Sequence, residues 1–125
     1  MINVTTVKKV NPNDLTAPKK NYLHAVGNGS TDLERLAYLI SNQSTVREAD
    51  CYAVVLSLVH NILDELEQGK IVKLDTLGTF QIGINSSGVE TETEVSTQQI
   101  NKAHINFRPD KRLRKLLNNV EYKLV

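Results

Sequence analysis

The sequence predicts a small α+β domain, and three features of its 125 residues carry that prediction. Residues 31–68 hold two segments in which apolar side chains recur at the spacing of one helix face. From Gly69 to Phe107 the pattern changes to the alternation that is typical of strands. Residues 107–117 then return to helical spacing, with leucines on one side of the helix and cations on another.

The N-terminal residues predict two strands joined by a loop. A Thr/Val/Lys segment with valines at positions 4, 7 and 10 favours the first strand, and residues 21–26 favour the second. Between them, Asn11-Pro-Asn-Asp14 is a turn cluster, and Gly27-Asn-Gly29 ends the second strand. We therefore expect an extension of strands over residues 1–30, before the first helix.

Two capping-box patterns predict the starts of two helices. Thr31-Asp-Leu-Glu34 opens a helix that runs to about Asn42, and Thr45-Val-Arg-Glu48 opens a longer one that runs to Gln68 and stops at Gly69. The first helix carries one apolar stripe, made of Leu33, Leu36, Ala37 and Ile40.

The second helix is too apolar for the surface of a small monomer. Twelve of the eighteen residues from Ala49 to Leu66 are apolar, so several sides of the helix need burial. We infer a homodimer whose core is shared through the Cys51–Leu66 helix. Cys51 is the single cysteine, so it forms no disulfide within the chain, and we expect it to pack in the core of a protein from a reducing compartment.

The rest of the chain predicts strands, a ribbon and a last strand. The strand segments are 71–74, 79–84, 102–107 and 121–125, and we expect the last of these to pair with a strand near the N-terminus. Glu90, Glu92 and Glu94 alternate with Thr91, Thr93 and Val95, a pattern with little to bury. We expect this segment to be a protruding ribbon or simply mobile.

The helix predicted over residues 107–117 has two unlike faces. Pro109 fits its first turn, and its apolar stripe, expected to be buried, is Leu113, Leu116, Leu117 and Val120. Its cationic row is Arg108, Lys111, Arg112 and Lys115. A row of fixed cations suits a phosphate backbone, although the same row is also compatible with an ordinary solvated helix face.

The near-neutral total of +1 hides a bipolar charge distribution. Residues 1–29 carry +3, residues 30–69 carry −5, residues 70–101 carry −2 and residues 102–125 carry +5. Fields act over about 8–10 Å in physiological salt, so a basic end can bind a polyanion while an acidic middle does not.

Several other functions find no support in the sequence. Export and membrane insertion lack the necessary apolar stretches, so we expect a cytoplasmic protein. Catalytic and phosphate-cradling motifs are absent, which predicts no enzyme, no small-molecule substrate and no cofactor. His60 and Asp64 have helical i, i+4 spacing, but a metal pair there is much less expected than a polar helix face.

The Gly78-Thr-Phe80 element and the Phe107-Arg-Pro109 element, in this order and at this spacing, resemble the bacterial HU and integration host factor family. The matching positions are Gly69, Val72, Leu74, Gly78, Thr79, Phe80 and Ile82, followed by Phe107, Arg108, Pro109, Lys111, Leu113 and Leu117. The resemblance covers about residues 31–118, and the extensions over 1–30 and 119–125 resemble those of longer HU-like proteins.

The resemblance implies an intertwined homodimer with a helical body, an antiparallel sheet saddle and short β-ribbon arms that reach around DNA on its minor-groove side. It implies a nucleoid-associated protein that binds the phosphate backbone with little sequence preference, in a salt-sensitive way. Together with the basic helix, it gives the expected DNA-binding residues Lys70, Lys73, Lys102, Arg108, Lys111, Arg112, Arg114 and Lys115.

The chain also departs from the family pattern. No proline lies between Pro18 and Pro109, the ribbon is short and acidic, and Asp110 stands where the family usually has glycine. These departures keep open an HU-like structural or protein-interaction dimer that has lost duplex binding. Binding of RNA or single strands is a third possibility, for which two Phe and four Tyr provide few stacking surfaces.

Overall fold

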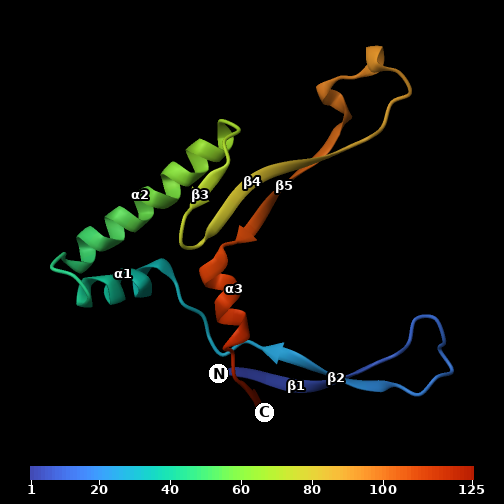
Figure 1. The fold of residues 1–125 in the computed structure, drawn as a ribbon, viewed down its shortest axis with the longest axis horizontal. Helices are drawn as coiled ribbons and strands as arrows, with labels where there is room; N and C mark the ends of the chain where they lie inside the picture. The colour runs from blue at the N-terminus through green and yellow to red at the C-terminus, as the bar shows by residue number, and fades with distance from the viewer. The chain divides into compact units, whose positions relative to one another are not determined.

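A computed structural model describes residues 1–125 as two compact units, and Figure 1 shows the elements of each. The first unit comprises Met1–Asp32 and Leu116–Val125, and the second comprises Leu33–Lys115. The elements are β1 (Ile2–Lys9), β2 (Lys20–Val26), α1 (Leu33–Asn42), α2 (Glu48–Glu67), β3 (Val72–Leu74), β4 (Gly78–Ser86), the 3-10 turns η1 (Glu92–Glu94) and η2 (Thr97–Gln99), β5 (Ile100–Pro109), α3 (Lys111–Asn118) and β6 (Tyr122–Leu124).

The N-terminal end of α2 differs from the prediction, whereas its C-terminal end agrees with it. The capping box predicted at Thr45 is wrong, because the N-cap residue is Arg47, which makes no side-chain capping bond. The Ser44 hydroxyl instead accepts from the Val46 amide at 3.3 Å, within the turn before the helix. At the other end the predicted stop is confirmed. Gly69 has a φ of 82°, and the Lys70 amide donates to the Glu65 carbonyl at 3.1 Å, as in a Schellman motif.

Little apolar surface is buried within the single chain. The buried hydrophobic residues are Val4, Ala37, Cys51 and Leu66. Of the stripe predicted for α1, Ala37 is buried, whereas Leu36 and Ile40 are exposed. The buried stripe predicted for α3 is wrong for the chain alone, since Leu116 and Leu117 are 57% and 68% exposed. Helical spacing shows which side chains share a face, but not what covers them.

The sheet of the second unit has the order β3-β4-β5 and is antiparallel throughout. Its register pairs Val72 with Phe80 and Phe80 with Phe107. The rings of Phe80 and Phe107 lie 4.8 Å apart, on the apolar face of the sheet. The paired strands β4 and β5 extend beyond β3 as a long hairpin, whose register shifts between Asn85 and Ser86 (Figure 1).

The end of that hairpin is not the extended ribbon that the Glu/Thr alternation suggested. Glu92–Glu94 forms the turn η1, and Thr97–Gln99 forms η2, which Ser96 and Gln99 close with a capping box. The Gln99 amide group also donates to the Ser87 carbonyl at 2.8 Å. Alternation without a buried face therefore gave no strand here, because no partner strand fixes it.

The first unit contains the sheet β2-β1-β6. β1 and β2 form an antiparallel hairpin, in which Lys9 pairs with Lys20 and Asn3 pairs with Val26. The expected pairing of the last strand with the N-terminal region is confirmed, since β6 lies parallel to β1 and Asn3 pairs with Lys123.

Candidate nucleic-acid interface

One face of the β3-β4-β5 sheet is polar, cationic and free of carboxylates. Because side chains alternate along a strand and cross-strand partners share a face, the register assigns the residues of this face. They are Lys73 from β3, Thr79, Gln81, Gly83 and Asn85 from β4, and Lys102, His104, Asn106 and Arg108 from β5. We call this set the polar sheet face. The opposite face carries Val72, Leu74, Phe80, Ile82, Ile84, Ala103, Ile105 and Phe107.

Two of the predicted residues meet on this face. Lys73 pairs with Thr79, and Thr79 pairs with Arg108, so the two cations lie in one cross-strand row. Both line a hollow of about 450 Å³ together with Gln81 and Asn106. Lys102 lies on the same face of β5, six residues before Arg108, and six residues of a strand span about 20 Å. Cations at such separations suit an extended polyanion better than a small anion.

The middle of the polar sheet face depends on a glycine. A Cβ at Gly83 would stand 2.5 Å from Nε2 of His104 and 2.7 Å from Nδ2 of Asn106. The missing side chain therefore leaves room for the imidazole and the amide to lie over the strand. Sequence reasoning overlooked His104, Asn106 and Gln81, which strict period-two alternation of β4 and β5 could have found.

The start of α3 differs from the prediction. Pro109 is the last residue of β5, paired with Gly78, and Arg108 lies in that strand rather than on the helix. The helix begins after Asp110, whose carboxylate accepts from the Lys111 amide at 2.8 Å and whose carbonyl accepts from the Arg114 amide at 3.1 Å. Asp110 thus supplies the polar N-terminal cap that the sequence reasoning had assigned to no residue.

The cations of α3 stand beside carboxylates. Lys111, Arg112 and Lys115 line a hollow of about 420 Å³ that Asp75 and Asp110 also line. Two negative charges in the same hollow weaken the positive potential that the helix can offer to a phosphate. The polar sheet face has the opposite arrangement, because no Asp or Glu shares it.

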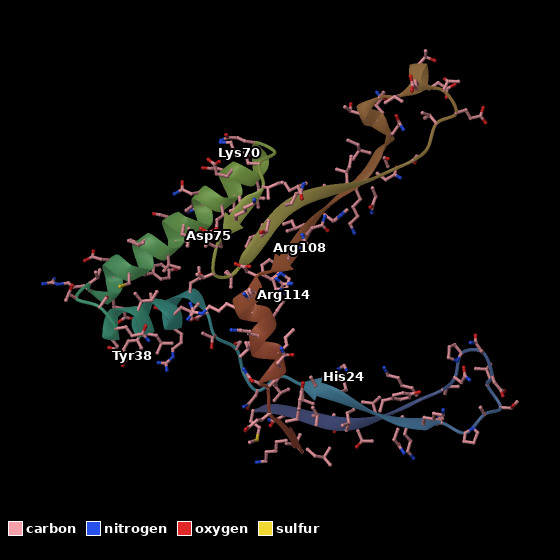
Figure 2. All side chains as sticks on the ribbon, in the orientation of Figure 1. His24, Tyr38, Lys70, Asp75, Arg108 and Arg114 are labelled. Atoms are coloured by element: carbon pink, nitrogen blue, oxygen red, sulfur yellow. The ribbon has the colours of Figure 1, made fainter.

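The other two predicted residues occupy separate places, as Figure 2 shows for the labelled Lys70 and Arg114. Lys70 follows the C-terminal end of α2, and its Nζ lies 2.9 Å from a carboxylate oxygen of Glu65. Arg114 is exposed on α3, near the junction with β5. The eight predicted residues therefore form no single patch: three share the polar sheet face, four lie on α3, and Lys70 is ion-paired.

No three His, Cys, Asp or Glu side chains come together in a way that could hold a metal ion. No helix combines the length and the apolar character needed to cross a bilayer.

Comparisons with known proteins match this architecture. The profile of the HU-HIG family, described as an HU domain fused to a winged helix-turn-helix, an Ig or a glycine-rich motif, matches residues 1–123. A proposed bacterial DNA-binding protein from Bacteroides vulgatus has a similar structure, with a TM-score of 0.68 and 13% identity over 99% of this chain. This chain spans 48% of that protein. No curated protein matches by sequence.

A second similar structure is that of Anabaena HU, solved in a cocrystal with DNA. Its TM-score is 0.55 and its identity 15%, over 70% of this chain and 97% of the HU chain. At such identities the likeness concerns the fold, and it shows an α+β, HU-like architecture. Because the family profile covers almost the whole sequence, this chain belongs to the HU-HIG family of HU-domain proteins.

Proposed function

We propose that this protein is a nucleoid-associated, architectural DNA-binding protein that acts as a homodimer and binds without sequence preference. The polar sheet face is the observation that carries this proposal. It presents Lys73, Arg108 and Lys102 with no carboxylate, and it adds the amides of Gln81 and Asn106. Cations, amides and hydroxyls are the groups that contact phosphate and sugar oxygens in protein–DNA complexes.

The chemistry of the face predicts a salt-sensitive interaction. Each cation that neutralises a phosphate releases a counterion, so the logarithm of the affinity falls with the logarithm of the salt concentration by about 0.9 per contact. Arg108 can hold a phosphate with two parallel hydrogen bonds, whereas Lys73 and Lys102 act as point charges. Contacts from these three residues to phosphate carry no sequence information, which fits binding that is independent of sequence.

The experiment is a fluorescence anisotropy titration of two unrelated labelled duplexes at several salt concentrations. We expect equal affinities and a steep salt dependence for the unmodified protein. The double variant K73Q/R108Q should weaken binding on both duplexes and make the salt slope shallower by about one per lost contact. K70Q is a control, because it removes one cation that lies off the polar sheet face and is ion-paired with Glu65. Unchanged binding by K73Q/R108Q would contradict the assignment of the face.

The cations of α3 form the second part of the proposal. Lys111, Arg112, Arg114 and Lys115 add electrostatic attraction, which Asp75 and Asp110 reduce. Replacement of Lys111 and Arg114 by Ala should therefore weaken binding less than K73Q/R108Q does, in the same titration. A larger loss from the helix pair would make α3 the main DNA contact instead.

The homodimer is proposed from the exposed apolar surface of α2. Val54 is 67% exposed in the single chain, and Leu58 and Leu63 are about half exposed. A soluble monomer rarely leaves such a surface uncovered. We expect Val54→Glu to dissociate the dimer in sedimentation velocity runs, whereas His60→Glu, which replaces a polar residue of the same helix, should leave it associated. A monomeric unmodified protein would contradict the proposal.

A protein-interaction dimer without duplex binding is the alternative function. Glu92 and Glu94 in η1, the ion pair of Lys70 and the carboxylates beside α3 favour it. This alternative expects a dimer in sedimentation but no anisotropy change at low salt. The two measurements together therefore distinguish the two functions.

A further inference from the structure

The hairpin of the first unit carries a second cationic face. The register of β1 with β2 and β6 puts alternate residues on one side of this sheet. Its members are Asn3, Thr5, Val7, Lys9, Lys20, Tyr22, His24, Val26 and Lys123, which we call the hairpin face. The opposite side carries Ile2, Val4, Thr6, Leu23, Ala25, Tyr122 and Leu124, with Lys8 and Asn21 at the end nearest the loop.

Like charges are paired directly on this face. Lys9 and Lys20 are cross-strand partners, an arrangement that costs stability when nothing lies between the two charges. Neither lysine forms an ion pair, and Nζ of Lys9 lies instead 5.7 Å from the centre of the Tyr22 ring. Asp14, in the connecting loop, is already engaged, because its carboxylate accepts from the Thr16 amide at 3.0 Å and from the Thr16 hydroxyl at 2.6 Å.

The two lysines also border a hollow. It has a volume of about 370 Å³, and its lining includes Lys9, Lys20, Tyr22, Pro12 and Pro18. Lys123 lies on the same face, in the row of Asn3, six residues from Lys9 along β1. That distance is about 20 Å, so one small anion cannot reach all three cations, but a continuous chain of phosphates can.

From this geometry we infer that the hairpin face is a second contact surface for the phosphate backbone of duplex DNA, separate from the polar sheet face. The inference rests on the proposed function for its choice of polyanion. Lys9 and Lys20 would share one phosphate at the hollow, which removes their mutual repulsion, and Lys123 would contact another. All three are lysines, so the face adds salt-dependent attraction and little orientation.

The test uses charge-matched double variants of the full chain in the anisotropy titration. K9Q/K20Q removes the paired lysines, whereas the control K8Q/K19Q removes the same charge from the preceding positions, of which Lys8 lies on the opposite side of the sheet. We expect K9Q/K20Q to weaken binding several-fold and to make the salt slope shallower by about one, because the two lysines share one phosphate, with a much smaller change in the control. Equal effects of the two pairs, or no effect of either, would overturn the inference.

The same titration separates this inference from the proposed function. If K73Q/R108Q loses affinity and K9Q/K20Q does not, the polar sheet face stands and the hairpin face is excluded. The reverse result supports the hairpin face and contradicts the polar sheet face. No binding by the unmodified protein contradicts both.

A second measurement needs no substitution. Lysine acetylation of the unmodified protein, read by mass spectrometry, should slow at Lys9 and Lys20 when duplex DNA is added, and should change little at Lys8. Equal acetylation with and without DNA would overturn the inference. Anionic lipid vesicles serve as the comparison polyanion, and protection by vesicles but not by DNA would assign the face to a membrane surface instead.

Discussion

The two three-stranded sheets of this protein reach a similar surface charge by different chemistry. Each has a mainly apolar side and a cationic side without carboxylates, because both follow the same period-two alternation. The polar sheet face of the second unit combines Arg108 with amides over Gly83, whereas the hairpin face of the first unit has lysines beside Tyr22. An arginine fork fixes direction and a lysine only adds charge, so in our proposal the first kind of face positions DNA and the second attracts it.

The largest expected effect comes from breaking the second sheet alone. A Cβ at Gly78 would meet the Arg108 carbonyl oxygen at 2.6 Å and the Phe107 ring at 2.5 Å, and the backbone carbonyl can move only with the strand. We expect Gly78→Ala to lower the free energy of unfolding by about 1–3 kcal/mol. Hydrogen exchange should speed up in β4 and β5 and stay unchanged in β1 and β2.

Gly83→Ala is the matched control for that variant. Its Cβ meets only the ends of the His104 and Asn106 side chains, which can turn away. The stability change should stay below about 1 kcal/mol, while DNA affinity falls because the two polar groups leave the face. A loss of stability as large as that of Gly78→Ala would show that the two glycines are equivalent.

The next effect concerns the carboxylate of Asp110, because α3 has carboxylates beside its cations and the two sheet faces have none. Asp110→Ala removes the N-terminal cap and should cost about 1 kcal/mol of stability, whereas Asp110→Asn keeps a side-chain acceptor. Both remove a carboxylate from the hollow lined by Lys111, Arg112 and Lys115, so both should raise DNA affinity. Thermal unfolding and anisotropy titration measure the two effects. Affinity that is unchanged by Asp110→Asn would mean that α3 does not approach phosphate.

A smaller effect is expected at the end of the long β4–β5 hairpin. Replacement of Glu90, Glu92 and Glu94 by Gln removes three negative charges without removing the η1 backbone bonds, such as that from the Glu94 amide to the Thr91 carbonyl. If the hairpin approaches DNA, affinity should rise several-fold, and most at low salt. Affinity that does not change at any salt concentration would place this end away from the phosphates.

The smallest effect sharpens the description of the first unit. Hydrogen bonds from the side chain and amide of Thr16 hold the pKa of Asp14 below its ordinary value. A lowered pKa in the folded state stabilises the fold above the ordinary pKa of Asp, about 3.9, and that contribution disappears as the pH falls toward the folded-state value. An NMR titration should show that the Asp14 carboxyl is protonated at a lower pH than that of a free Asp. Thr16→Val should abolish part of this lowering of the pKa. Titration at the ordinary value would contradict the turn geometry.

Periodicity and turn chemistry predicted much of the fold, because they act over short distances. The Schellman end at Gly69 and the positions of the strands follow from local residues, and the pairing of β6 with β1 is also confirmed. The predicted box at Thr45 failed because α2 has its N-cap position at Arg47, two residues later, and the Ser44 hydroxyl bonds within the turn before the helix. Pro109 was placed in a helix because its fixed φ suits a first turn, but it also suits the end of an edge strand such as β5.

The candidate site was predicted less well than the fold. Helical spacing grouped Arg108 with cations of α3 in one row, although the strand end at Pro109 puts Arg108 on the sheet with Lys73. The sequence also could not show that Lys70 forms an ion pair with Glu65. The chain turns after α2, and the path of that turn decides whether the two side chains come together. Grouping residues on a face requires the register, which depends on contacts between distant segments.

The parallel pairing of β6 with β1 affects the order in which the strands of the first unit pair during folding. It joins residues 2–4 to residues 122–124, the most distant segments of the chain, whereas β1 and β2 meet through a local turn. Such a pairing closes late, because a long loop costs entropy before the contact returns any stability. During synthesis the β1 edge of the hairpin therefore stays open over residues 2–4 until residues 122–124 have left the ribosome, and in that interval Lys9, farther along β1, helps to keep other strands away.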